Sequence, residues 1–134
     1  MAKLTIIEGI GQTLAKKFQA GGVRGTRTLL TKGGTKKGRL ALSEACGLDE
    51  GRILKFVNHA DLMRIKGVGG EYAELLEAAG VDSVPELARR NAANLATAME
   101  SVNATRKLVR SVPTEERISD WVGQAGKLGR AVSH

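Results

Sequence analysis

The residues best suited to chemistry in this chain are basic side chains gathered in its first third. Between Gly9 and Ser43 there is no acidic residue. The basic residues of this segment are Lys16, Lys17, Arg24, Arg27, Lys32, Lys36, Lys37 and Arg39. A run of cations without anions attracts polyanions, of which nucleic acid is the most common. The pattern therefore predicts binding of an acidic partner.

Residue types that catalyse reactions or hold metals are scarce. His59 is the only histidine within the expected fold, and we assign it a capping or surface role, while Cys46 has a packing role. Glu71, Glu74 and Glu77 share one helix face, but a single solvated stripe lacks the converging ligands that a hard cation requires. We therefore predict no catalytic residue, no metal site, no cofactor and no enzymatic activity.

Residues 31–39 are rich in glycine and invite comparison with a phosphate-binding loop. A Walker A loop requires Gly-x-x-x-x-Gly-Lys-Ser/Thr after a strand, whereas Gly38 is followed by Arg39 and no strand is expected before it. The sequence instead predicts a mobile basic loop, with Thr35 as a candidate cap of the next helix.

Composition limits the fold class. The chain has 134 residues, which is the size of one domain, and only 3% of them are aromatic. Single-strand binders of the OB and RRM types stack bases on exposed aromatic side chains, so these folds are disfavoured. Alanine, leucine, glutamate, lysine and arginine dominate stretches with helical spacing, and strand patterns are weak. We predict an all-α protein.

The cysteine content and the hydropathy pattern indicate a compartment. Cys46 is the only cysteine, so no disulfide can form within the chain. No signal segment is recognisable, and no apolar run approaches the roughly 20 residues that span a bilayer. We expect a cytoplasmic protein without a membrane partner.

The sequence contains an internal repeat. A shift of 58 positions places residues 7–11 over residues 65–69, and the match continues through later apolar positions. We expect repeat one at about 3–59 and repeat two at about 60–125. The two repeats are predicted to pack as one compact, pseudo-symmetric domain over 1–125, with a flexible tail at 126–134.

Helix signals recur within each repeat. Short helices are expected before Gly9 and Gly67, and longer ones after Gly11 and Gly69, the latter ending at Gly80. Ser83 and Glu86 form a capping box. Further helices are expected at about 35–46, 49–58, 92–102, 104–111 and 114–125, the last of which docks through Trp121.

Two glycine turns carry a family resemblance. Gly9-Ile10-Gly11 with Ala15, and Gly67-Val68-Gly69 with Ala73, resemble the helix-hairpin-helix motif in its tandem form, which occurs in DNA repair, recombination and transcription proteins. The whole chain also resembles a bacterial family of uncharacterised domains built from two such units. The resemblance implies that backbone N–H groups of the turn and of the next helical turn donate to a phosphate oxygen, without reading bases.

The resemblance and the charges together define the predicted nucleic-acid-binding residues. In repeat one they are Gly9, Ile10, Gly11, Gln12, Thr13, Lys16, Lys17, Lys32, Lys36, Lys37 and Arg39. In repeat two they are Gly67, Val68, Gly69 and Gly70. Neither turn has the basic residue that binding members of the motif commonly carry after the second glycine. Repeat two has five acidic residues and no basic one between Gly67 and Ala88, so its turn is the weaker candidate for phosphate binding.

Two hypotheses follow. In the first, the protein binds the backbone of nucleic acid, DNA in the first place, through the first turn and the basic loop. In the second, the fold is a protein interaction or scaffold module that can associate with itself, because its charge is unevenly spread. Residues 1–60 hold 11 basic and 4 acidic side chains, whereas residues 61–134 hold 10 of each.

Overall fold

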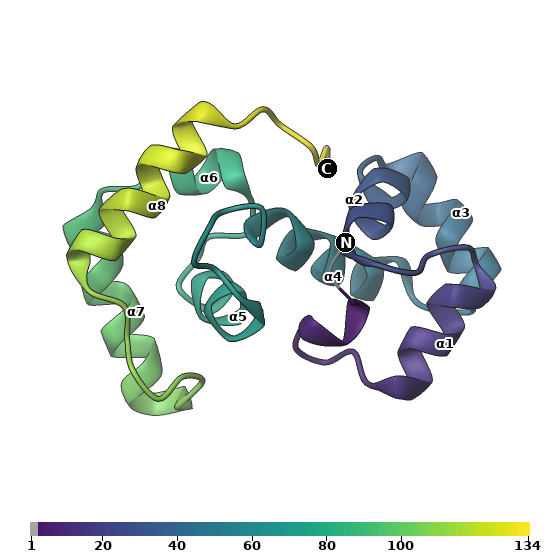
Figure 1. The fold of residues 1–134 in the computed structure, drawn as a ribbon, viewed down its shortest axis with the longest axis horizontal. Helices are drawn as coiled ribbons and strands as arrows, with labels where there is room; N and C mark the ends of the chain where they lie inside the picture. Colours follow the sequence, from purple (N-terminus) through teal and green to yellow (C-terminus); the bar gives the residue numbers. More distant parts are fainter. Residues whose placement is uncertain (1–2) are drawn as a thin grey trace. The chain divides into compact units, whose positions relative to one another are not determined.

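The computed structural model describes residues 3–134, which contain eight α-helices and no strand. The predicted all-α class is thus confirmed. The elements in Figure 1 are a short 3₁₀-helix η1 (Leu4–Ile6) and the helices α1 (Gln12–Ala20), α2 (Thr26–Gly33), α3 (Lys36–Cys46), α4 (Glu50–Leu62), α5 (Gly70–Ala78), α6 (Val84–Ala88), α7 (Ala92–Arg106) and α8 (Glu115–Lys127).

The chain divides into two compact units. Unit 1 comprises Met1–Asp61 together with Ala131–His134, and unit 2 comprises Leu62–Arg130. The division falls directly after Asp61, beside the segment where the sequence repeat changes copy. Packing of the two repeats as a single domain over 1–125 stays a prediction.

Unit 1 encloses an apolar core between its helices. The buried side chains at its centre include Ile7, Phe18, Val23, Leu29, Ile53 and Val57. Phe18 of α1 meets Phe56 of α4 edge to face, with ring centroids 6.2 Å apart, which is a favoured aromatic geometry. Helix α3 packs against both α1 and α2, so the segment that carries the basic residues belongs to this core structure.

Unit 2 is held together by α8, which packs on α6 and α7. Ile118, Trp121 and Ala125 recur at helical spacing and are all buried, Trp121 being only 2% exposed. They join an apolar cluster that includes Leu75, Leu76, Leu87, Leu95 and Met99. The prediction that the last helix docks through its tryptophan is confirmed.

Helix caps follow the sequence signals. The Thr35 hydroxyl accepts a hydrogen bond from the Gly38 amide at 3.0 Å, and the Ser83 hydroxyl accepts one from the Glu86 amide at 3.3 Å. Each bond satisfies a donor that the helix itself leaves unpaired. Gly80, just after α5, has a φ of +97°, a conformation that favours glycine.

Two elements differ from the expectation. No separate helix forms at 104–111: residues 104–106 continue α7, which ends at Arg106 because Lys107 takes a left-handed φ of +51°. Asn103 then holds the following loop by donating to the Val109 carbonyl and accepting from the Val109 amide. The predicted mobile loop at 31–39 is also wrong, since these residues belong to α2 and α3 except for the connection Gly34-Thr35.

The last residues also differ from the flexible tail predicted at 126–134. Helix α8 continues to Lys127, and Val132 is 2% exposed within unit 1. The Ser133 amide donates to the Gly34 carbonyl at 2.7 Å. Sequence periodicity could not reveal this packing, because the partners lie about a hundred residues apart.

Candidate nucleic-acid interface

The first glycine turn, residues 9–11, joins η1 to α1. Gly9 has a φ of +92°, which a residue with a side chain rarely adopts, and a Cβ there would lie 3.3 Å from the Phe56 ring. Ile10 is buried and fixes the turn to the core. Bonds from the Ile7 amide to the Leu4 carbonyl and from the Ile10 amide to the Ile7 carbonyl keep the approach to α1 compact.

The N-terminus of α1 is open to solvent. The first hydrogen bond within the helix runs from the Ala15 amide to the Gly11 carbonyl at 3.0 Å, which leaves the amides of Gln12 and Thr13 without a backbone acceptor among residues 3–134. Gly11 supplies no side-chain cap, and a Cβ placed on it would meet nothing within 4 Å. Amides without a backbone acceptor thus coincide with the positive end of the helix dipole at exposed residues, an arrangement that suits anion binding.

A groove lies beside this helix end. It has a volume of about 340 Å³ and is lined by Lys3, Thr5, Gln12, Gln19 and Arg24, among others. No acidic side chain lines it, and the ends of Lys3 and Arg24 are exposed. The groove thus continues a cationic surface from the open amides of α1.

The sequence prediction missed these two basic residues of the groove. Arg24 belongs to the acid-free segment but stands far from the turn in sequence, and Lys3 precedes it. An isolated antiparallel bridge between Lys3 and Gly25 brings them together. Local sequence patterns carry no signal for such a bridge.

Four of the predicted cations lie at two separate places on unit 1. Lys16 and Lys17 are exposed on α1, the helix that follows the turn. Lys36 and Lys37 are exposed in the first turn of α3, which Figure 1 shows at the upper edge of unit 1, whereas the turn lies at its lower edge. Lys36 and Lys37 therefore do not form one patch with the turn.

Lys32 is a further exposed cation, on the last turn of α2. A Cβ on Gly22 would lie 2.7 Å from the Nζ atom of Lys32, so the ammonium group of Lys32 lies over the end of α1. This position is on α1's C-terminal side, whereas the open amides lie at its N-terminus.

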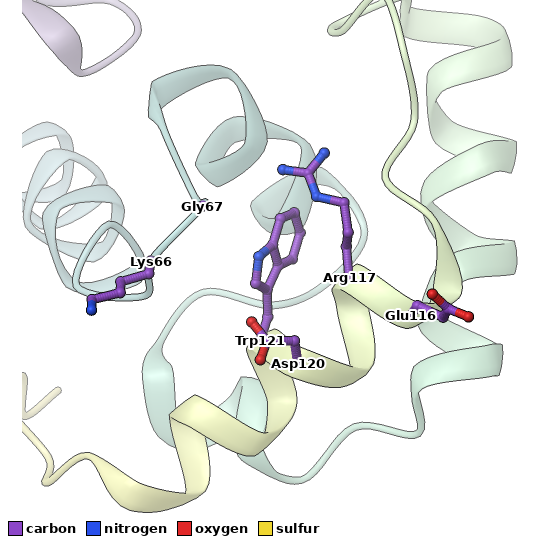
Figure 2. A pocket seen from close by; sticks show the side chains of 6 residues that line it. All are labelled: Lys66, Gly67, Glu116, Arg117, Asp120 and Trp121. Carbon is purple, nitrogen blue, oxygen red and sulfur yellow. The ribbon is translucent and has the colours of Figure 1, made fainter.

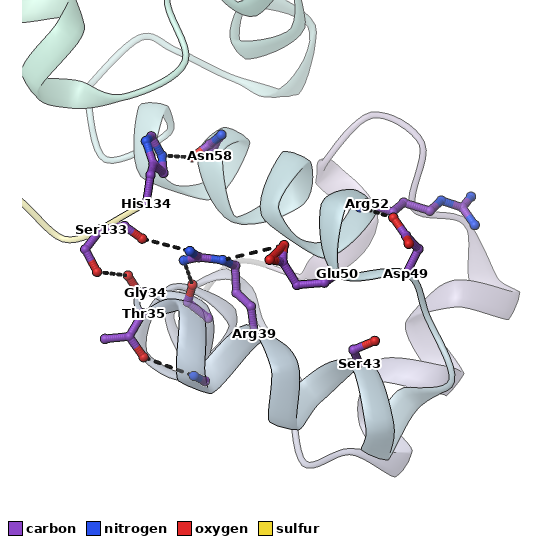
Figure 3. A network of polar contacts seen from close by, with 12 residues as sticks. Gly34, Thr35, Arg39, Ser43, Asp49, Glu50, Arg52, Asn58, Ser133 and His134 are labelled. Carbon is purple, nitrogen blue, oxygen red and sulfur yellow. Dashed lines mark hydrogen bonds and ion pairs between the residues drawn. The ribbon is translucent and has the colours of Figure 1, made fainter.

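Arg39 does not belong to the surface. Its side chain is 1% exposed, and its guanidinium group donates to the Gly33 carbonyl at 2.9 Å and to the Ser133 carbonyl at 2.8 Å (Figure 3). Its Nε atom lies 4.0 Å from a carboxylate oxygen of Glu50. A guanidinium group held in this way cannot reach a phosphate from solvent, so Arg39 is withdrawn from the predicted interface.

Most helix starts of the two units differ in charge. In unit 1, the first turns of α1, α2 and α3 contain no acidic residue, whereas that of α4 contains Glu50. In unit 2, those of α5, α6 and α8 contain Glu71, Glu86, Glu115 and Glu116, whereas that of α7 contains none. Acidic side chains neutralise the positive helix end, so the starts of α1, α2 and α3 are more attractive to an anion than those of α5, α6 and α8.

The second glycine turn has the same local backbone conformation as the first. Gly67 has a φ of +96°, Gly69 has φ and ψ of −92° and −173°, and Gly11 has −93° and −169°. Val68 is buried as Ile10 is. The surroundings differ, because the Gln124 side chain of α8 accepts from the Lys66 amide at 2.8 Å and donates to the Lys66 carbonyl at 3.2 Å.

A pocket of about 340 Å³ adjoins the second turn (Figure 2). Lys66, Gly67, Glu116, Arg117, Asp120 and Trp121 line it. Arg117 lies over the rings of both Tyr72 and Trp121, at 5.3 and 5.5 Å, which fixes its guanidinium group. Cations and carboxylates are thus mixed here, in contrast to the acid-free groove of unit 1.

Reactive residue types take no part in these surfaces. Burial raises the pKa of the Cys46 thiol, with a smaller opposing effect of the Gly21 backbone and of Lys32. His59 is fully buried in the last turn of α4, so the expected surface role is wrong, whereas a capping role stays a prediction. In residues 3–134 no three histidine, cysteine or acidic side chains are placed to hold a metal ion. No helix in the same range has the length and apolarity that a membrane span needs.

Comparison with known proteins gives one match. A family model described as a domain of unknown function (DUF4332) matches residues 8–128. Neither a curated protein nor a solved structure matches the chain.

Proposed function

The chain belongs to the DUF4332 family, and from the geometry of its own first turn we propose that it binds the phosphate backbone of nucleic acid, DNA in the first place, without catalysing a reaction. In this proposal the two glycine turns are helix-hairpin-helix motifs arranged as a pseudo-symmetric tandem. A protein that binds nucleic acid fits the cytoplasmic location that the sequence predicts.

One observation carries the proposal. Gln12 and Thr13 are exposed residues whose amides have no backbone acceptor in the described chain, and the adjoining groove has Lys3 and Arg24 but no acidic side chain. Amides at a helix start bind one phosphate group, and flanking cations bind its neighbours along the strand. Such contacts recognise phosphate and not bases, so the binding is independent of sequence.

The proposal also explains why Gly11 bears no side chain. Its φ and ψ are open to any residue, and no neighbour would obstruct a Cβ. Asparagine, aspartate and serine are usually favoured at this position of a helix because they pair with its first amides. A glycine leaves these amides free for an external acceptor.

A fluorescence-anisotropy titration with a random-sequence DNA duplex, repeated at several salt concentrations, tests the proposal. If about four phosphates are neutralised, the logarithm of the binding constant falls with a slope near −3.6 against the logarithm of salt. An RNA duplex of the same length distinguishes the two nucleic acids. Absence of binding at low salt refutes the proposal.

Charge-reversal pairs locate the surface. Lys3→Glu with Arg24→Glu acts on the groove, and Lys36→Glu with Lys37→Glu acts on the start of α3. We expect the first pair to abolish binding and the second to weaken it less. Arg110→Glu with Lys127→Glu, in unit 2, changes the net charge equally and serves as the control.

A second candidate function rests on unit 2. Its glycine turn is clamped by Gln124, and α5 carries Glu71, Glu74 and Glu77, which repel phosphate. We propose that, if the titration shows no binding, the chain acts as a protein interaction or scaffold module. Chemical cross-linking of the chain alone, compared at low and high salt, then tests self-association between its basic and acidic surfaces.

A further inference from the structure

The segment Ala131–His134, here called the strap, is bound in a seat on unit 1 (Figure 3). The Ser133 amide donates to the Gly34 carbonyl at 2.7 Å, and the Ser133 hydroxyl lies 3.3 Å from the same oxygen. His134 Nε2 lies 3.3 Å from Asn58 Oδ1. The strap therefore contacts both the α2–α3 connection and α4.

A buried arginine forms the floor of the seat. The Arg39 guanidinium group holds the Ser133 carbonyl, the Gly33 carbonyl and, more distantly, the Glu50 carboxylate. Removal of the Ser133 carbonyl takes a charge-assisted hydrogen bond away from this guanidinium group. Arg39 thus favours an occupied seat over an empty one.

Glycine and valine shape the rest of the seat. A Cβ on Gly34 would lie 2.6 Å from the Ala131 carbonyl oxygen, so only glycine allows the strap to pass this close. Val132 is 2% exposed and is the apolar anchor of the strap. The seat thus combines main-chain recognition with a site for a β-branched side chain, as extended peptides are bound at the edges of other folds.

We propose that this seat is an interaction surface for an extended peptide segment and that its partner is the strap of a second copy of this chain. The contacts of the strap to unit 1 are all available to an identical segment from another molecule. The connecting residues Leu128, Gly129 and Arg130 are exposed and lie outside any helix. Exchange therefore retains every contact of the seat and acts on the connection, where the Gly129 carbonyl accepts from Arg64 Nη2 at 2.8 Å.

The equilibrium between the closed monomer, which binds its own strap, and the dimer, which exchanges straps, depends on the connection. A short connection presents the chain's own strap at an effective concentration of the order of millimolar, which favours the closed monomer. Withdrawal of the own strap leaves the seat open to the strap of another copy. Shortening of the connection has the same effect, because it opposes the return of the strap to its own seat.

The first test offers the strap in trans. The full chain carrying Val132→Asp cannot seat its own strap, because a carboxylate would replace the buried valine. We expect it to bind a fluorescein-labelled peptide of residues 126–134 in an anisotropy titration, and the unchanged chain to bind about tenfold or more weakly, because its own strap competes. A peptide with the same Val-to-Asp change is the matched control. Absence of binding between a folded Val132→Asp chain and the unaltered peptide overturns the proposal.

The second test concerns the partner. Deletion of Gly129 and Arg130 shortens the connection by up to about 7 Å. In sedimentation we expect a mass of about twice the 14.2 kDa of one chain, and a return to one chain mass when Val132→Asp is added. Leu128→Asp, which removes an exposed apolar side chain outside the strap, should leave the dimer intact. A monomeric deletion variant, or a dimer that persists with Val132→Asp, overturns the assignment of the second copy.

Discussion

Replacement of Gly11 by aspartate separates the stability of the fold from the proposed function. Gly11 has the extended backbone of a helix N-cap, with φ and ψ of −93° and −169°, and space is free around its Cα atom. The new carboxylate can therefore accept hydrogen bonds from the first amides of α1 without strain. The same carboxylate occupies the donors that the proposal assigns to phosphate.

The two effects have opposite signs. A capping carboxylate at a helix start in place of glycine stabilises the fold by about 0.3–1 kcal/mol, through its hydrogen bond and the helix dipole. Removal of a hydrogen bond to a charged phosphate costs about 1.5–3 kcal/mol, which corresponds to an affinity lower by about 10- to 150-fold. The salt slope should also become shallower by about 0.9 for each phosphate that the variant no longer neutralises.

Two measurements on the same preparation check this prediction. Urea unfolding followed by circular dichroism should show a higher midpoint for Gly11→Asp than for the unchanged chain. Anisotropy titration with the DNA duplex should show the weaker binding. A variant that is more stable and binds more weakly cannot owe its weaker binding to unfolding.

Gly69→Asp is the matched control, because Gly69 has nearly the same φ and ψ and is equally unobstructed. It should leave DNA binding unchanged, since the second turn is clamped by Gln124 and adjoined by acidic side chains. Equal decreases of affinity in both variants would refute the assignment of binding to the first turn. Full affinity in Gly11→Asp would show that the α1 amides do not bind phosphate.

Other predictions concern stability. Trp121→Ala should lower the free energy of unfolding by about 3–5 kcal/mol in urea denaturation, because it removes a large buried side chain; a decrease below about 1 kcal/mol would contradict this packing. Gly80→Ala should lower the free energy of unfolding by about 1–2 kcal/mol because of the positive φ of this residue. Gly123 lies inside α8, and a Cβ there would meet nothing within 4 Å, so Gly123→Ala should raise the free energy of unfolding by about 0.5–1 kcal/mol. Because burial raises the pKa of Cys46, the unfolded thiol ionises first as pH rises, so stability should fall through the ordinary thiol pKa by more than in Cys46→Ala.

The sequence predicted those parts of the fold that depend on local signals. Apolar spacing placed α8 and its buried Trp121, and side-chain chemistry identified the caps Thr35 and Ser83. The prediction of a helix at 104–111 was wrong because Lys107 adopts a left-handed conformation that lysine rarely takes. No local sequence pattern indicates this conformation.

Glycine and charge are harder to interpret from sequence where distant contacts decide their role. In the sequence, Gly33 and Gly34 indicate mobility, but a Cβ on Gly33 would lie 2.5 Å from the Val57 side chain, so packing requires glycine there. Arg39 is predicted as a phosphate-binding cation because it lies in the acid-free basic segment. Its partner Ser133 is 94 residues away in sequence, beyond the reach of any local pattern.

The candidate site was predicted in part. Residues 9–13 form the expected turn and helix start, but whether they bind phosphate stays a prediction. Lys3 and Arg24 join the surface only through the bridge between Lys3 and Gly25. Lys36 and Lys37 have the same charge but lie at another edge of the unit, because α3 begins at its upper edge and the turn lies at its lower edge.

The strap has a consequence for the order of events during synthesis. Unit 2 is continuous in sequence, so all its residues leave the ribosome before Ala131 does. Unit 1 emerges first, yet the carbonyl partner that Ser133 supplies to Arg39 arrives 94 residues later. The seat on nascent unit 1 therefore stays open until the whole of unit 2 has been synthesised, and unit 1 is completed only when the strap binds.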